Sequence, residues 1–256
     1  MERVFITGAS SGIGAALALF YAGRGASLGL VGRRRDALEA LAARLPGEHE
    51  TYALDVRDRD ALHAAARHFL QGGPVDVVIA SAGISVGTLT EEAEDFAVFR
   101  AIQETNLLAM VATFEPFIAG MRARGGGRLV GIASVAAVRG LPGAGAYSAS
   151  KAAVRTYCES LRVELHGSGV RVVTLSPGFI RTPMTERNPY AMPFLMPAGD
   201  FARQAVRHID RGTRAVVIPW QMGAVAWLLR GIPGWLYDSV AARRKRKPRQ
   251  GGGEGR

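Results

Sequence analysis

Short apolar runs alternate with longer amphipathic stretches along most of this chain. Seven runs have the length and content of buried strands: 3–7, 27–32, 50–56, 75–81, 127–134, 170–177 and 215–219. Between them, apolar residues recur at helical spacing in 12–24, 36–45, 59–70, 95–123 and 149–167. Buried strands that alternate with helices predict a parallel sheet covered on both faces. Right-handed crossovers then give an α/β, doubly wound fold with a seven-stranded parallel sheet.

The pattern changes only near the C-terminal end. No domain boundary is expected before about residue 220, so 1–219 is predicted to be one domain, with a lid at about 183–202. An apolar, tryptophan-rich helical extension is predicted over 220–242, where Pro233 would break or kink the helix. Residues 243–256 are predicted to be a basic, glycine-rich flexible tail.

Composition narrows the class of protein. The 256 residues are 48% hydrophobic, which is ample for a large core and excludes a disordered chain. The one cysteine, Cys158, is expected to be a buried thiol, and it permits neither an intramolecular disulfide nor a cysteine-based zinc site. A chain without disulfide bonds suits a reducing, cytoplasmic setting. "MERVFITGAS" lacks the features of a signal peptide, and no apolar run approaches the roughly 20 residues of a spanning helix.

The net charge of +10 is largely local. Six basic residues lie in "RRKRKPR" (243–249), so only four net positive charges remain for the rest, and no nucleic-acid partner is indicated. Trp220, Trp227 and Trp235 flank the apolar stretch before this run. The arrangement is typical of a segment at a membrane surface, here through 220–249. Alternatively, the extension folds over a substrate site or forms a subunit interface, and the basic run is a solvated tail.

A glycine-rich turn, "TGASSGIG" (7–14), joins the first predicted strand to a helix, as a nucleotide-binding turn must. Glycines permit the tight turn and the close approach of backbone to a pyrophosphate, which the helix N-terminus attracts. The candidate contacts here are Gly8, Ser10, Ser11, Gly12, Ile13 and Gly14. A turn without a ligand is the alternative.

The end of the second strand indicates which nucleotide is bound. NAD sites usually have Asp or Glu there, whereas this strand ends in "LVGRRR", with Gly32 followed by Arg33 and Arg34. Guanidinium groups suit a 2′-phosphate, so we predict NADP(H) rather than NAD(H). The alternative is a pair of solvated arginines. Asp55 could accept a bond from the adenine amino group, with Val56 beneath the ring, or it could simply cap the next helix.

"YSASK" (147–151) places Tyr147 and Lys151 four residues apart, on one face of a helix. A tyrosine that titrates near pH 10 needs a nearby cation to exchange protons at neutral pH. Lysine supplies a compact charge that arginine does not, and this arginine-rich chain has only three lysines. Ser134 ends the fifth predicted strand, at the sheet edge where ligands bind, and could polarise a substrate carbonyl.

Together, these motifs resemble the short-chain dehydrogenase/reductase family. The resemblance covers residues 3 to about 220 and includes, in the family's order, "TGASSGIG", "LDV", "ASAG", "ETNLLA", "GIAS", "YSASK" and "SPGFIRTPM". It implies a single Rossmann domain and hydride transfer between a nicotinamide and a carbonyl or alcohol, with no metal required. One departure is that Ala80 and Ser81 stand where the family usually has asparagines, or Asn-Ala.

The resemblance also implies individual roles. Tyr147 would be the general acid in reduction and the base in oxidation, with its pKa lowered by Lys151, which also holds the nicotinamide ribose. Ser134 would steady the substrate oxygen, and Asn106 would hold a water of the proton relay. The remaining expected cofactor contacts are Ser81, Ala82, Gly83, Tyr147, Lys151, Pro177, Gly178, Ile180 and Thr182. A homodimer or homotetramer is expected, often formed through the helices at 95–123 and 149–167.

Substrate identity is expected to depend on the proline-broken segment after "SPGFIRTPM". Its apolar residues predict an apolar carbonyl or alcohol, and the alternative is that they only pack the lid onto the core. Candidate substrate contacts are Ser134, Val135, Leu141, Tyr147, Phe179, Tyr190 and Phe194, with Val138, Met192, Leu195 and Met196 beside them. Rival functions are a membrane-surface keto-lipid or steroid-like reductase and a nicotinamide-sensing module without catalysis.

Overall fold

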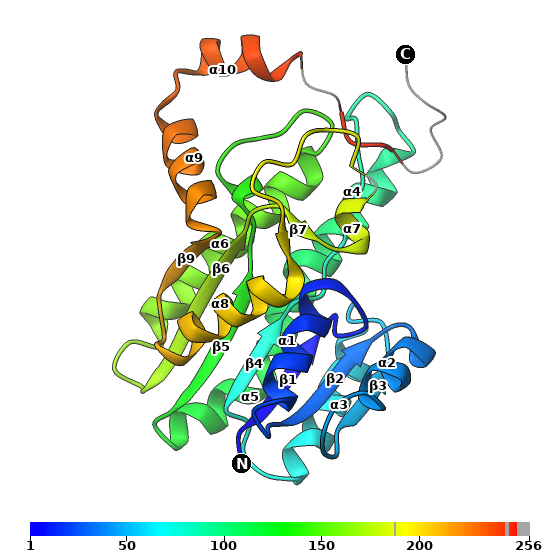
Figure 1. Ribbon diagram of the computed structural model, residues 1–256, viewed down its shortest axis with the longest axis vertical. Coiled ribbons are helices and arrows are strands. Elements are labelled where there is room, and N and C mark those ends of the chain that lie inside the picture. The colour runs from blue at the N-terminus through cyan, green and yellow to red at the C-terminus, as the bar shows by residue number, and fades with distance from the viewer. Residues whose placement is uncertain (187, 244–245, 250–256) are drawn as a thin grey trace.

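The computed structural model describes residues 1–186, 188–243 and 246–249, and its centre is a parallel sheet. The sheet has seven strands in the order β3-β2-β1-β4-β5-β6-β9 (Figure 1), which confirms the predicted fold. Every neighbouring pair is parallel. The strands are β1 (Arg3–Thr7), β2 (Ser27–Gly32), β3 (Glu50–Ala53), β4 (Val77–Ala80), β5 (Gly127–Ile132), β6 (Val170–Pro177) and β9 (Ala215–Ile218).

Helices cover both faces of the sheet because successive strand residues point to opposite sides. In β1, Val4 and Ile6 belong to one buried apolar cluster and Phe5 to the other. The first cluster includes α1 (Gly12–Ala22), α2 (Arg35–Ala42) and α8 (Ala198–Asp210). The second includes α3 (Arg59–Gln71), α5 (Ala109–Ala123) and α6 (Gly145–Glu164). Cys158 is buried in this second cluster, as expected for a structural thiol.

Two predicted elements differ from the structure in ways that concern the site. The stretch 95–123 is not one α-helix: α4 (Asp95–Gln103) and α5 are separated by a π-helical turn, Glu104–Leu108. α6 begins at Gly145 rather than 149, so it carries Tyr147 within its first turn. Several strands end earlier than predicted, since the residues after them turn into the loops that line the site.

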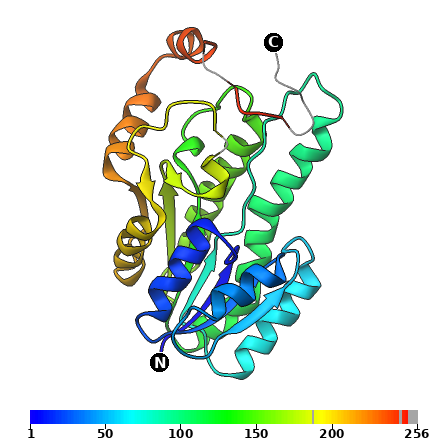
Figure 2. The same ribbon diagram turned by 45° about the vertical axis from the view of Figure 1, so that its right-hand side comes forward.

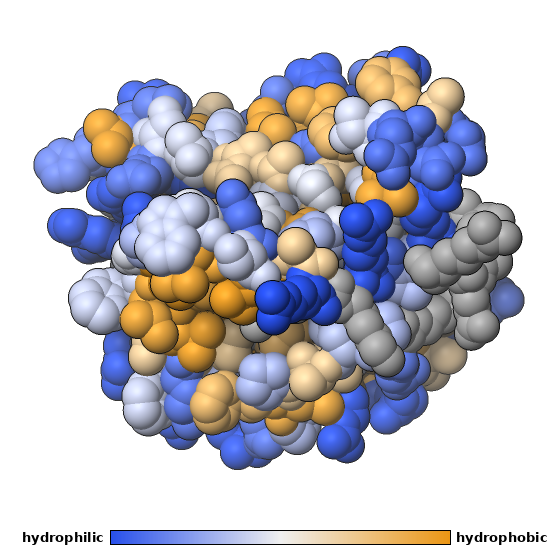
Figure 3. All heavy atoms as spheres, turned by 90° about the horizontal axis from the view of Figure 1, so that it is seen from above, coloured by the Kyte–Doolittle hydropathy of each residue, from blue (hydrophilic) through white to orange (hydrophobic). Residues whose placement is uncertain are grey.

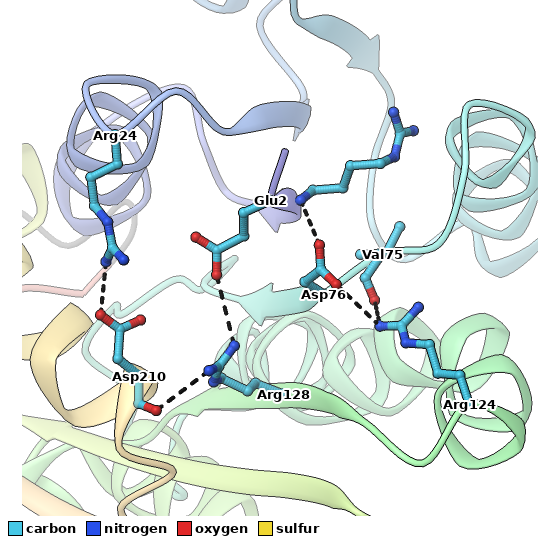
Figure 4. A network of polar contacts seen from close by, with 8 residues as sticks. Glu2, Arg24, Val75, Asp76, Arg124, Arg128 and Asp210 are labelled. Carbon is cyan, nitrogen blue, oxygen red and sulfur yellow. Dashed lines mark hydrogen bonds and ion pairs between the residues drawn. The ribbon is translucent and has the colours of Figure 1, made fainter.

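The amino ends of the strands are closed by a polar network (Figure 4). Arg128 contacts the Glu2 carboxylate at 3.7 Å and the Asp210 carbonyl oxygen at 3.4 Å, and Arg24 pairs with Asp210 at 2.8 Å. Asp76 accepts from the Arg3 backbone N–H at 2.8 Å. These contacts join β1, β5, α1 and α8 at the end of the sheet opposite the carboxyl edge, where ligands bind in such folds.

The segment after β6 includes the range that was predicted to be a lid. It contains β7 (Ile180–Arg181), α7 (Pro183–Glu186) and β8 (Met196–Pro197), and β7 pairs with β8. The predicted lid range of 183–202 is wrong at its end, because α8 begins at Ala198 and buries Phe201 and Ala202 in the core.

The extension forms two helices, α9 (Trp220–Gly231) and α10 (Gly234–Ala241), separated at Pro233 as the sequence predicted. Among the described residues, no helix has the length and hydropathy needed to cross a membrane. Trp220, Trp227 and Trp235 are 74%, 78% and 73% exposed. Seen from above, apolar residues gather on the side of the molecule where α9 and α10 lie (Figure 3).

Residues 246–249 lie near the top of the molecule, on the side of α4 (Figures 1 and 2). Residues 246–249 pack against the body, where the Gly87 N–H donates to the Pro248 carbonyl at 2.9 Å and Gly87 forms a parallel bridge with Arg249. The flexible-tail prediction for 243–256 is therefore wrong for these four residues, because acidic side chains of the body pair with Arg249. Residues 244–245 and 250–256 lie outside the described residues.

Candidate functional site

A cavity of about 620 Å³ opens at the carboxyl ends of the strands and spans the point between β1 and β4 where the strand order reverses. Ligands bind at this position in open α/β sheets. We call it the main cavity. Every residue predicted to bind the cofactor lines it, from Gly8 in the first turn to Thr182 after β7. Three of the four predicted catalytic residues, Ser134, Tyr147 and Lys151, also line it, and Asn106 does not.

The first turn has no room for side chains at its glycines. A Cβ on Gly8, whose φ is +69°, would lie 2.7 Å from the backbone of Ala82, and a Cβ on Gly14 would lie 2.3 Å from the Gly8 carbonyl oxygen. Ser11 precedes α1 with extended backbone and makes no capping bond with its side chain. The α1 N-terminus is therefore left without a side-chain cap at a cavity wall, where the helix dipole favours an anion.

The arginines after β2 lie beside this turn. Arg33 and Arg34 line the main cavity with exposed side chains, and Arg34 Nη2 donates to the Ser10 carbonyl at 3.2 Å. A Cβ on Gly32 would lie 3.3 Å from the Ser10 side chain, so an acidic residue there would press against the turn. The wall thus presents positive charge without a carboxylate at the end of β2.

Asp55 and Val56 form the adjoining wall after β3. Asp55 does not cap the next helix, because Asp58 does so by accepting from the Ala61 N–H at 3.0 Å. Instead, Asp55 pairs with the Arg57 guanidinium at 2.7 Å, and this hydrogen bond holds the pKa of the Asp55 carboxyl below its usual range. The carboxylate is therefore ionised and acts only as an acceptor at neutral pH.

Tyr147, Lys151 and Ser134 meet at the other end of the main cavity. One helical turn separates Tyr147 from Lys151, whose Nζ lies 5.8 Å from the phenol ring centroid and donates to the Ile132 carbonyl at 2.8 Å. Ser134 precedes a short 3₁₀ turn, Val135–Ala137, where its hydroxyl accepts from the Ala136 N–H at 3.1 Å. The Ser134 hydroxyl is also hydrogen-bonded to Tyr147.

The pKa of Tyr147 differs from the expectation. Burial raises it, although the hydrogen bond with Ser134 lowers it in part. Burial likewise lowers the pKa of Lys151 to about 8, because an ammonium loses hydration inside the protein. The predicted lowering of the Tyr147 pKa by Lys151 is therefore wrong for this structure, in which the ammonium faces the Ile132 carbonyl and desolvation dominates.

Asn106 lies in the π-helical turn and is 2% exposed. Its Nδ2 donates to the Ile84 carbonyl at 3.0 Å and to Ser150 Oγ at 2.9 Å, while Oδ1 accepts from the Ile84 N–H at 2.8 Å. Ser150 in turn donates to the Tyr147 carbonyl at 2.8 Å. Both amide protons of Asn106 are thus used within the protein, so only Oδ1 has capacity left for the predicted water.

Most of the predicted substrate contacts lie elsewhere. Of that set, only Ser134 and Tyr147 line the main cavity, whereas Val135, Leu141, Phe179, Tyr190 and Phe194 do not. Tyr190 packs against Phe179, with ring centroids 6.3 Å apart. Phe194, Leu195 and Met196, which the sequence placed at or beside the substrate, line a separate hollow near α8 and not the main cavity. Phe194 is half exposed, at a left-handed φ of 57°. Pro183, Met184 and Thr185 line the main cavity instead.

Sequence reasoning missed Lys247, which the returning tail brings to this end of the site. Its Nζ lies 5.8 Å from the Tyr147 ring centroid and donates to Ser85 Oγ at 2.7 Å. A signal was available, since Lys247 is one of only three lysines in an arginine-rich chain.

The fold and this site define a nucleotide-binding α/β oxidoreductase, and comparison with known proteins identifies the family. The sequence profile of short chain dehydrogenases matches residues 2–192. The chain belongs to the short-chain dehydrogenase/reductase family. Members of this family are NAD(P)-dependent oxidoreductases, and this protein is accordingly an enzyme of that class.

Individual relatives are similar over nearly the whole chain. An uncharacterized oxidoreductase from Myxococcus xanthus is 40% identical over 246 residues, which are 94% of this chain and 97% of that protein. The solved short-chain dehydrogenase from Streptomyces avermitilis is 25% identical, with a TM-score of 0.80 over 95% of this chain and 99% of the other. Levodione reductase is 27% identical, with a TM-score of 0.79 over 87% and 98%.

Proposed function

We propose that this enzyme transfers hydride between NADP(H) and the carbonyl or secondary alcohol of a largely apolar small molecule, with Tyr147 as general acid and base. The observation that carries the proposal is that one cavity has a phosphate-type turn and two arginines at one end and the Ser134, Tyr147 and Lys151 side chains at the other. A dinucleotide has the same two-ended chemistry, with an anionic half and a reactive half.

The residues of the main cavity fit such a cofactor. The turn from Gly8 to Gly14 has no Cβ where a pyrophosphate needs close approach, and it lies at the N-terminus of α1. Arg33 and Arg34 would hold a 2′-phosphate, and Asp55 with Val56 would hold the adenine. When bound, the nicotinamide supplies or accepts the hydride.

The side chains of the protein would transfer the proton and position the groups that exchange it. In reduction, the Tyr147 hydroxyl gives its proton to the substrate oxygen, and Ser134, already hydrogen-bonded to the phenol, donates to the same oxygen. Lys151 would hold the ribose and supply positive charge beside the phenol. Asn106 acts as a positioning residue, because it connects the Ile84 loop to Ser150 and so to the first turn of α6.

The replacement of Tyr147 by phenylalanine tests this proposal. We expect turnover of a panel of ketones and aldehydes with NADPH to fall by about 10²- to 10⁴-fold, the usual contribution of a general acid. Binding of NADPH, followed by fluorescence, should change by less than about threefold, since the substitution removes one hydroxyl. Unchanged turnover would refute the role of Tyr147, and cofactor binding by the wild type without any turnover would favour a sensing module.

A membrane-surface reductase is the second candidate, favoured by the exposed tryptophans of α9 and α10. Flotation of the full chain with liposomes, compared with a variant in which Trp220, Trp227 and Trp235 are serine, tests it. Equal flotation of the two proteins would exclude attachment through these tryptophans. We also propose a homo-oligomer formed through the helical stretches at 95–123 and 149–167, and the exposed Leu108 and Val163 within them support this.

A further inference from the structure

Residues 246–249, here called the C-terminal strap, cross the site beside Tyr147. Two glycines of the body make room for it. A Cβ on Gly87 would lie 2.2 Å from the Lys247 carbonyl oxygen, and a Cβ on Gly143 would lie 2.9 Å from the Arg246 side chain. The strap is therefore in close backbone contact with the loops that follow β4 and precede α6.

Arg249 fixes the strap in one register. Its guanidinium pairs with Asp95 at 2.8 Å, Glu94 at 3.1 Å and Glu92 at 3.3 Å. The Asp95 side chain is only 3% exposed, and the Arg249 hydrogen bond lowers the pKa of its carboxyl. A buried carboxylate without a cation is unfavourable, so this pairing favours the docked strap.

The docked strap places Lys247 against the catalytic phenol. Its Nζ lies 5.8 Å from the Tyr147 ring centroid, the same separation as the Lys151 Nζ. Two of the three lysines in the chain therefore flank one tyrosine. Lys247 is half-buried, and Ser85 Oγ, at 2.7 Å, is a neutral partner.

Lys247 lacks a counter-ion in the part of the chain that the structure describes. The nearby carboxylates of Glu92, Glu94 and Asp95 are paired with Arg249 instead. Burial lowers the pKa of Lys247 to about 8, as expected for an ammonium that has lost water without gaining a negative partner. An anion that arrived beside Tyr147 would supply that partner.

We propose that Lys247 binds an anionic group of the substrate, so that the enzyme acts on carbonyl compounds that carry a carboxylate or similar anion on an apolar body. The inference rests on the proposed function, because it places the substrate carbonyl at Tyr147. Lys247 is then a specificity-determining residue, and the strap is part of the substrate site.

A matched pair of substrates tests the proposal in the full chain. The probes are 4-carboxybenzaldehyde and its methyl ester, reduced with NADPH by the wild type and by the Lys247→Gln, Lys247→Arg and Arg243→Gln variants. Arg243 is an exposed residue of the same basic run, so its variant controls for the loss of one positive charge. The wild type should prefer the acid.

We expect Lys247→Gln to lower the acid-to-ester ratio of kcat/KM by about 10- to 100-fold, mainly through KM, because a charge-assisted hydrogen bond is lost. Lys247→Arg should retain part of the preference, and Arg243→Gln should leave the ratio unchanged. Arg249→Gln, which releases the strap, should lower the ratio as Lys247→Gln does.

Equal losses for the acid and the ester in Lys247→Gln would mean that Lys247 acts through Tyr147, and would overturn the proposal. A ratio that Lys247→Gln leaves unchanged would also overturn it.

If the wild type reduces neither probe, the proposed function fails for this pair. Calorimetry of 4-(hydroxymethyl)benzoate with NADP⁺-saturated enzyme then decides: binding that Lys247→Gln abolishes supports the site, and binding absent from the wild type or unchanged in the variant overturns it.

Discussion

Replacement of Asn106 by alanine is expected to lower the free energy of unfolding by about 2 to 3 kcal/mol. The side chain makes three hydrogen bonds, two with the backbone of Ile84 and one with Ser150. Ser150 still donates to the Tyr147 carbonyl and loses only the hydrogen bond that its hydroxyl accepts from Asn106, so its share of the cost is small. The two Ile84 groups lose their partners.

An unpaired buried polar group costs about 1 to 3 kcal/mol. The Ile84 bonds are only partly buried, so water can replace some of the lost hydrogen bonds. The expected loss of stability therefore lies at the lower end of the combined cost of the two Ile84 groups. For a chain of this size, each kcal/mol shifts Tm by about 2 to 4 °C. Tm should therefore fall by roughly 5 to 10 °C.

Urea unfolding followed by circular dichroism measures the effect, with Gln103→Ala as the matched control. Gln103 lies on the adjoining helix and donates one bond to the Ala146 carbonyl, at 2.9 Å, so its loss should cost about 1 kcal/mol or less. A loss in Asn106→Ala no larger than that of the control would refute the view that this amide holds the Ile84 loop against α6.

Three further predictions concern the cofactor end and the buried lysine. Alanine at both Arg33 and Arg34 should raise KM for NADPH at least about tenfold more than KM for NADH, since one charge-assisted bond is worth that much, and equal changes would show that the 2′-phosphate lies elsewhere. Gly14→Ala should weaken NADPH binding and lower Tm, because its Cβ would lie 2.3 Å from the Gly8 carbonyl oxygen, and unchanged calorimetric affinity would contradict this. Burial lowers the pKa of Lys151 from 10.5 to about 8, so the charged lysine opposes folding below pH 8 and this effect fades as pH rises toward 10.5. Lys151→Met should therefore be more stable than the wild type by as much as about 3 kcal/mol at pH 7, with a gain that vanishes near pH 10 and with loss of turnover.

The sheet could be predicted because its strands are apolar on both faces and alternate with stretches of helical spacing. β1 shows the reason: Phe5 packs on one side and Val4 and Ile6 on the other, so no residue of the run needs to be polar. The cofactor wall was predictable for a related reason. Its residues follow strand ends directly, and the topology of a parallel sheet brings those ends to one edge.

Features that depend on distant contacts could not be predicted in this way. The π-helical turn at Asn106 is held by bonds to Ile84 and Ser150, 22 and 44 residues away. The rise in the Tyr147 pKa comes from burial by the assembled site rather than from its own helix. The docking of the strap depends on Arg249 and Asp95, which are 154 residues apart, and a basic run by itself predicts only a solvated tail.

Substrate binding by Lys247 and membrane attachment through the basic run compete with each other. Lys247 and Arg249 face the protein, where a serine hydroxyl and three carboxylates are their partners, so these charges are not available to an anionic lipid surface while the strap is docked. Membrane attachment would then depend on the exposed tryptophans of α9 and α10, and apolar attachment responds little to salt. Flotation that persisted in high salt would fit a docked strap, whereas flotation abolished by salt would mean that basic residues bind the lipid, either exposed ones such as Arg243 or those of a strap that has left the site.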